Sequence, residues 1–279
     1  MMKTTLFAII LTASVFAQDF IPFIEKLDPE WRKKIASAGI TREIEYIDTP
    51  GFDVKEGNLP EYFKSVLYDE NGKVQFVAQK LLTDDNAAEY EFKYNDKGYL
   101  QDIIMNWTDN YGNPSKISYN FAYEESRLSY VAQFDDLYGN GGATMQWVYQ
   151  YSVDGRPESI VVRYFSSDEI GLFAEIAKYY FDRRGRIFIY ESEDSKVTYS
   201  YNEEGTLAET LKEAHEIAVR TVYTYDGSGN LVSKTETGDA AETFAIFTVN
   251  AKGFPEKSSM LIKMAGVSDH SVNYLYFYE

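Results

Sequence analysis

The chain has 279 residues, no cysteine, two histidines and a formal net charge of -17. The absence of cysteine excludes a fold held by disulfides, and so few histidines leave little material for catalytic triads or dyads built on Cys or His. So acidic a chain excludes nucleic-acid binding, which needs a basic surface, and is repelled by anionic membrane surfaces. The acidity suits the solubility of an exported protein.

Residues 1–18 predict a secretory signal peptide. Lys3 precedes an apolar run from Leu6 to Phe16, and Val15-Phe16-Ala17 offers small residues at a cleavage point. The run is shorter than the roughly twenty residues of a membrane helix. We therefore expect an exported protein that is periplasmic, at the cell surface or extracellular. The lack of disulfides favours a bacterial cell envelope.

The segment that follows the signal peptide predicts one short amphipathic helix, from Pro29 to Ala38. Asp28 is a good N-cap, and proline is tolerated in the first turn, where its missing N–H has no helical partner. Gly39 ends the helix. Trp31 and Ile35 fall on one face, so we expect them to pack against a sheet.

A tyrosine–aspartate repeat fills residues 61–279, which we take as the repeat domain, with residues 19–60 as the N-terminal helix and linker. Each copy has an aromatic residue, an Asp or Asn that can bond the backbone ahead, and a glycine free to adopt positive φ. In most copies an apolar residue then begins the return strand. The copies lie at 68–74, 94–100, 151–155, 181–187, 201–207, 225–231 and 249–254, with a copy that lacks glycine at 123–128.

Residues with alternating character precede each of these turns, as in Tyr90-Glu91-Phe92-Lys93-Tyr94. Period two places aromatic residues on one face of a strand and polar residues on the other. Second turns near 108–113, 135–140 and 238–239 separate the strands of successive copies. The predicted fold is all-β: a curled antiparallel up-and-down meander of about sixteen strands, with one short N-terminal helix. Its aromatic face should bury six residues: Tyr119, Phe121, Trp147, Tyr149, Tyr199 and Tyr223.

The stretch from Ser166 to Tyr179 interrupts this pattern. Ser167 or Asp168 is a suitable cap for a short helix, and a long loop that leads into a strand fits the same residues. Both interpretations stay open.

The run Tyr-Thr-Tyr-Asp-Gly-Ser-Gly-Asn-Leu at 223–231 resembles the YD repeat of bacterial Rhs proteins and animal teneurins, and weaker copies extend from Tyr62 to Tyr278. In that family the hairpins join into one strip of sheet that coils into a shell, which can enclose a toxin. The resemblance implies a hairpin architecture and an exported setting. This chain is far too short for a large shell, and its repeats vary in length.

No residue pattern predicts a catalytic, metal or cofactor site. His215 and His270 fall in turns two hairpins apart, too far to share a metal ion. The many carboxylates show no marked pair, and the Asp-rich turns lack the ligand spacing of a known calcium loop.

The sequence therefore favours an exported, non-enzymatic β-repeat protein that binds a glycan or a cell-envelope partner. An outer-membrane β-barrel is the alternative, suggested by the alternating strands and the aromatic run from Tyr274 to Tyr278. A carbohydrate-active enzyme that uses paired carboxylates is a second alternative.

The candidate binding residues come from a repeated tripeptide. Tyr-Gly-Asn occurs in two consecutive turns of the second set, where rings for sugar stacking stand beside carboxylates. The same tripeptide is also good turn chemistry, so a purely structural role stays open. The set predicted to bind a glycan is Trp107, Asp109, Tyr111, Asp136 and Tyr138.

Overall fold

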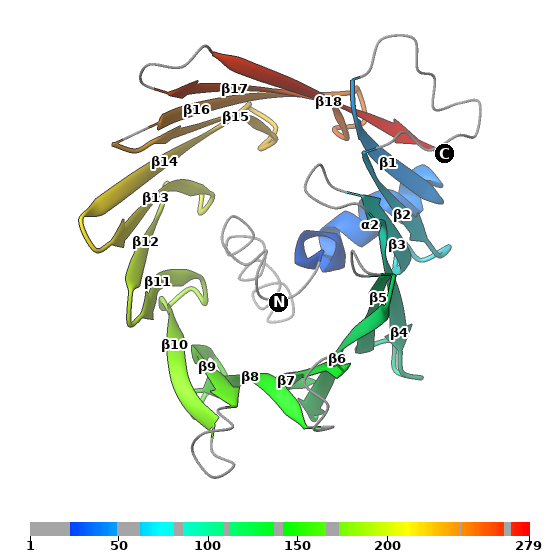
Figure 1. The fold of residues 1–279 in the computed structure, drawn as a ribbon, viewed down its shortest axis with the longest axis vertical. Coiled ribbons are helices and arrows are strands. Elements are labelled where there is room, and N and C mark those ends of the chain that lie inside the picture. Colours follow the sequence, from blue (N-terminus) through cyan, green and yellow to red (C-terminus); the bar gives the residue numbers. More distant parts are fainter. Residues whose placement is uncertain are drawn as a thin grey trace. The chain divides into compact units, whose positions relative to one another are not determined.

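The computed structural model describes residues 23–48, 62–80, 86–108, 112–136, 142–165, 173–239, 241–264 and 269–279. The predicted signal peptide lies outside the described residues. The described residues form a 3₁₀ helix, one α-helix and a single antiparallel sheet of 18 strands (Figure 1). The all-β prediction is confirmed.

The helices are η2 (Ile24–Leu27) and α2 (Pro29–Ala38). The strands are β1 (Arg42–Ile47), β2 (Phe63–Tyr68), β3 (Val74–Lys80), β4 (Ala88–Tyr94), β5 (Leu100–Thr108), β6 (Pro114–Glu124), β7 (Arg127–Asp135), β8 (Ala143–Tyr151), β9 (Pro157–Phe165), β10 (Phe173–Phe181), β11 (Ile187–Ser192), β12 (Ser195–Tyr201), β13 (Leu207–Ala214), β14 (Ile217–Tyr225), β15 (Leu231–Thr237), β16 (Ala241–Val249), β17 (Pro255–Met264) and β18 (His270–Tyr278).

The sheet is a meander in which consecutive strands pair, and β1 pairs with both β18 and β2, so that the order of pairing closes on itself. This is the connectivity of a β-barrel. About sixteen strands were expected. One of the added strands is β1, which lies in the segment interpreted as linker and alternates Glu43-Ile44-Glu45-Tyr46. In the interrupted stretch, β10 begins at Phe173.

The chain divides into two compact units. Unit 1 comprises residues 1–42, 64–187 and 279, and unit 2 comprises residues 43–63 and 188–278.

Seven turns of the tyrosine–aspartate repeat share one hydrogen-bonding pattern. The first residue of each turn donates its backbone N–H to the carbonyl four residues on and accepts from the glycine N–H three residues on. Its side-chain oxygen also accepts from the backbone N–H four residues on, at 2.8–3.1 Å. This bond explains why Asp, Asn or Ser opens every turn. The seven first residues are Asp69, Asn95, Ser152, Asp182, Asn202, Asp226 and Asn250.

Successive turns of unit 1 are linked by the residue that follows the glycine, or by its equivalent in the copy without glycine. In three cases this residue lies against the tyrosine that opens the next copy. Lys73 lies over Tyr94 at 5.0 Å, Tyr99 stacks on Tyr123 at 5.1 Å, and Arg127 lies over Tyr151 at 5.5 Å. The repeat is therefore held together by ring contacts between neighbouring turns as well as by the sheet.

One face of the sheet, called here the aromatic face, carries most of the buried side chains in each unit. On β4, Tyr90 and Phe92 are buried while Glu89, Glu91 and Lys93 are exposed on the opposite face. Of the six residues expected to be buried, five are, with Trp147 only 1% exposed. Phe121 is the exception, because its side chain is half-buried.

Helix α2 belongs to unit 1 and has the predicted bounds. The Asp28 carboxylate accepts the backbone N–H groups of Glu30 and Trp31, and Gly39 ends the helix in the left-handed conformation. Ile35 is fully buried. Trp31 contacts the sheet as expected, since its indole N–H lies 3.4 Å from the Tyr68 hydroxyl of β2. Its ring is only half-buried, so the cost expected for truncating a fully buried tryptophan does not apply to it.

Candidate functional site

Trp107 and Asp136 are the predicted binding residues that the structure describes; Asp109, Tyr111 and Tyr138 lie outside the described residues. Trp107 lies near the end of β5, half-buried, and pairs with Ser115 of β6. Ile103 lies four residues before Trp107 on β5 and pairs with Tyr119 of β6. Trp107, Ile103 and Tyr119 therefore lie on the same, aromatic face.

Asp136 follows β7 and is exposed. Its neighbour Asp135 pairs with Ile117, two residues along β6 from Ser115, and so lies on the same face as Trp107. The carboxylate of β7 that shares the face of Trp107 is therefore Asp135.

A second surface, in unit 2, brings more polar chemistry together. Five residues lie directly opposite one another on consecutive strands from β12 to β16, and the row they form is called here the threonine row. It consists of Tyr199, Thr210, Thr221, Glu236 and Thr243. The row lies on the aromatic face, because Tyr199 and Thr221 are buried.

The two central threonines are buried without a partner in the described part of the chain. Thr210 is 1% exposed and Thr221 0%, and neither hydroxyl makes a hydrogen bond there. A buried hydroxyl left unsatisfied costs about 1–3 kcal/mol, and valine would fill the same volume without that cost. Both hydroxyls are therefore donors and acceptors that the described residues leave unused.

Tyr223 flanks the row on β14. Burial raises the pKa of Tyr223, and the nearby Thr210 hydroxyl opposes this rise, although the two hydroxyls do not meet in hydrogen-bonding geometry. On the next strand Lys234 lies opposite Tyr223 and forms an ion pair with Glu236 at 3.5 Å. Both charged side chains are half-buried.

The surface thus offers hydroxyls, one carboxylate and one ammonium group next to phenol rings. Lys234 and Glu236 are half-buried, whereas the two tyrosines and the two central threonines are at most 7% exposed, so a ligand reaches those four side chains only where neighbouring side chains move aside. Of the five residues in the row, only Glu236 is a carboxylate, so the row contains no glycosidase-type pair.

The aromatic alternation predicts that the tyrosines of this surface lie on one face, but it does not predict the threonines or the charged residues. The alternation of β14 does indicate one of them, because Thr221 lies two residues before Tyr223 and its side chain therefore points to the same face. The register that adds Lys234 and Glu236 is set by the turn at 226–230 and by a bulge just before it, between Thr224 and Tyr225 at the end of β14. Counting alternate residues from β14 through that turn therefore does not predict which residues of β15 lie opposite those of β14.

Among the described residues, no group of three or more His, Asp or Glu side chains is arranged to hold a metal ion. His215 lies in the tight β13–β14 turn, exposed, with its Nε2 3.8 Å from Asp194. In the described part of the chain, no helix has the length and apolar character needed to cross a membrane.

Neither a protein-family model nor a curated protein matches the sequence. Among solved structures, the chain is similar to a porin-like protein from Bacteroides uniformis, at 9% identity and a TM-score of 0.36 over 86% of this chain and 98% of that one. A porin-like protein from Bacteroides vulgatus is similar at 12% identity and a TM-score of 0.32, with the same coverage. The TcdB2-TccC3-Cdc42 structure is similar at 13% identity and a TM-score of 0.35, over 75% of this chain and 12% of that one.

Proposed function

We propose that this chain is an exported, non-enzymatic β-repeat protein that binds carbohydrate on the threonine row. The observation that carries the proposal is the pair of buried hydroxyls, Thr210 and Thr221, for which the described residues supply no hydrogen-bond partner. Sugar hydroxyls supply both donors and acceptors to such groups. The rings of Tyr199 and Tyr223 and the ion pair of Lys234 with Glu236 complete a face of the kind that sugars recognise.

Replacing the two threonines tests the proposal, because Thr210→Val and Thr221→Val keep the shape and remove only the hydroxyls. We expect the double variant to lose carbohydrate binding on a glycan array by at least about tenfold. We expect its free energy of unfolding, measured in urea without ligand, to stay level or rise by about 1 kcal/mol, because two unsatisfied hydroxyls are removed.

Thr198→Val and Thr235→Val form the matched control, since both residues lie on the opposite face of neighbouring strands. They should leave carbohydrate binding unchanged. Wild-type protein that binds no glycan on the array, or a Thr210/Thr221 double variant that binds as wild type does, would refute the proposed site.

An outer-membrane barrel is the second candidate, and the closed order of strand pairing favours it. The residues of β4 on the face opposite the aromatic face argue against it, whereas in unit 2 the same face of the sheet exposes Val222, Phe244 and Ile246. On β4 that face consists of Glu89, Glu91 and Lys93, all exposed. A lysine on the lipid face costs about 2–4 kcal/mol at the bilayer midplane, and carboxylates also cost energy there.

We therefore expect the mature protein to remain in the aqueous phase when detergent is absent. The measurement is phase partition of the expressed protein between buffer and lipid vesicles, followed by flotation. Stable co-flotation that resists high salt and alkaline washing would contradict the soluble binding protein and favour the barrel.

A further inference from the structure

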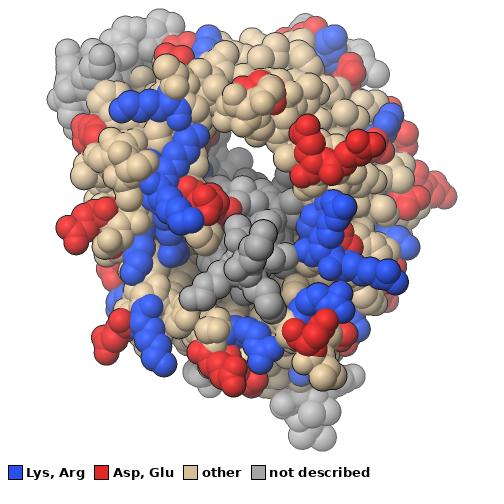
Figure 2. Space-filling view, turned by 180° about the vertical axis from the view of Figure 1, so that it is seen from behind, with Lys and Arg blue, Asp and Glu red and all other residues tan. Residues whose placement is uncertain are grey.

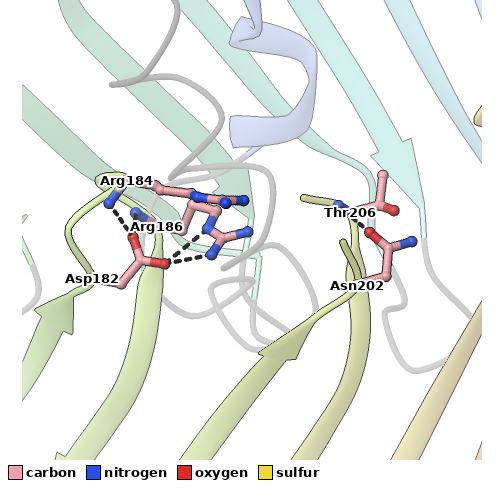
Figure 3. A network of polar contacts seen from close by, with 5 residues as sticks. All are labelled: Asp182, Arg184, Arg186, Asn202 and Thr206. Carbon is pink, nitrogen blue, oxygen red and sulfur yellow. Dashed lines mark hydrogen bonds and ion pairs between the residues drawn. The ribbon is translucent and has the colours of Figure 1, made fainter. Parts of the chain in front are cut away.

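The turn between β10 and β11, in unit 1, is the most cationic of the repeat. It comprises residues 182–186 and carries Arg183, Arg184 and Arg186, and it is called here the arginine turn. Figure 3 shows Asp182 folded back into this turn. One carboxylate oxygen accepts the backbone N–H groups of Arg184 and Arg186 at 2.8 and 2.9 Å, and the other accepts Nε and Nη2 of Arg186 at 2.9 and 2.6 Å.

Both carboxylate oxygens of Asp182 therefore accept hydrogen bonds from within its own turn. Its bonds to Arg186 hold its pKa below the usual value against the opposing effect of burial, and the pair is internally neutral. The Asp182 carboxylate does not pair with the guanidinium group of Arg183 or Arg184. Their side chains are exposed, and within the described residues they make no hydrogen bond or ion pair.

No other turn of the seven places two cations at its tip. The tip positions elsewhere hold Glu70-Asn71, Asp96-Lys97, Val153-Asp154, Glu203-Glu204, Gly227-Ser228 and Ala251-Lys252. Two adjacent, uncompensated guanidinium groups are therefore a particular feature of this turn. On the face drawn in Figure 2, Lys and Arg side chains lie in several groups among Asp and Glu side chains, although the chain is strongly acidic.

Resting on the proposed function, we propose that the arginine turn binds the anionic groups of an acidic polysaccharide, so that the carbohydrate ligand carries carboxylate or sulfate. Guanidinium presents paired N–H donors that match the oxygens of either group, and such charge-assisted bonds are stronger than neutral ones. Charges farther away than about 8–10 Å are largely screened at physiological salt, so the local pair acts despite the net charge.

The surroundings favour a flexible chain over a flat anionic surface. The preceding turn of the same unit exposes Asp154, which pairs with Arg156 at 2.7 Å, and the turn before it exposes Glu124 and Glu125, of which Glu125 lies 3.8 Å from Arg127. A membrane laid across several turns would bring its charges against these carboxylates. A single polysaccharide chain can contact the tip of one turn and avoid the acids of the others.

The test uses the mature protein with three probes: dextran sulfate, polygalacturonate and neutral dextran. We expect titration calorimetry at low salt to give tighter binding of at least one anionic polymer than of dextran, weakened several-fold between 50 and 200 mM salt as charge contacts are screened. Arg183→Gln with Arg184→Gln should weaken that binding at least about tenfold. A preference for dextran sulfate would assign a sulfated ligand, and one for polygalacturonate a carboxylated ligand.

Arg220→Gln with Lys263→Gln is the charge-matched control, because both residues are exposed on the opposite face of the sheet in unit 2. It should leave binding within about twofold. Equal losses in both double variants, or equal affinity for double-stranded DNA, would overturn the inference. Neutral glycan bound at the threonine row with no gain from anionic groups would overturn the inference and leave the proposed function standing. Binding of no glycan at all would refute the proposed function itself.

Discussion

Gly72→Ala should destabilise unit 1 by about 3 kcal/mol or more, through steric overlap added to backbone strain. Gly72 has φ +72°, which costs an L-residue about 1–2 kcal/mol. An added Cβ would also stand 2.1 Å from the carbonyl oxygen of Arg32 in α2. Backbone on both sides of this contact cannot rotate away as a side chain does, so the turn and the helix must separate. Urea denaturation measures the loss.

Gly229→Ala is the matched control. Gly229 occupies the same turn position in another copy, with φ +81°, and an added Cβ there meets nothing within 4 Å. It should show the left-handed strain alone, about 1–2 kcal/mol. Equal losses in the two variants would mean that the close approach of α2 to the Gly72 turn has no energetic weight.

The contrast between these glycines also shows what the sequence predicts and what it does not. The repeat assigns a positive φ to both residues, and both have it. Local turn chemistry is encoded within five residues, which is why the turns, the bounds of α2 and most of the buried aromatic residues were predicted correctly. The packing of Arg32 against Gly72 depends on where α2 docks, and no local pattern reports that.

The carboxylate that shares a face with Trp107 is likewise not fixed by local turn chemistry. Asp135 and Asp136 are adjacent, and which of them shares a face with Trp107 depends on the register between β6 and β7. That register includes a shift between Ala122 and Tyr123, close to the turn that lacks glycine. A one-residue shift exchanges the two faces of a strand, so an assignment from spacing alone fails there.

Trp31 shows the limit of burial inferred from periodicity. The helical pattern places Trp31 and Ile35 on one face, and both do contact unit 1. Of the two, only Ile35 is fully buried, whereas Trp31 is half-buried. The Lys26 ammonium group lies over the Trp31 ring at 4.5 Å. Periodicity gives the direction of a side chain, and the depth of its burial comes from the neighbours that the fold supplies.

Trp147→Ala should be among the most damaging single substitutions in the chain, at about 3–5 kcal/mol. The Trp147 side chain is 1% exposed, lies opposite Val131 and Val162 on the neighbouring strands, and has the Tyr119 ring at 6.4 Å. Truncation leaves a cavity that strands fixed on both sides by the sheet cannot close. Thermal and urea unfolding measure the loss.

Trp107→Ala is the informative companion, because Trp107 shares the aromatic face of unit 1 but is half-buried. Part of its ring is already in water, so its truncation should cost about 1–2 kcal/mol, well below the loss for Trp147. If Trp107 also serves as a stacking ring for carbohydrate, the variant loses binding out of proportion to its stability. A loss of stability equal to that of Trp147→Ala, with binding retained, would instead make Trp107 a core residue and remove it from the binding surface.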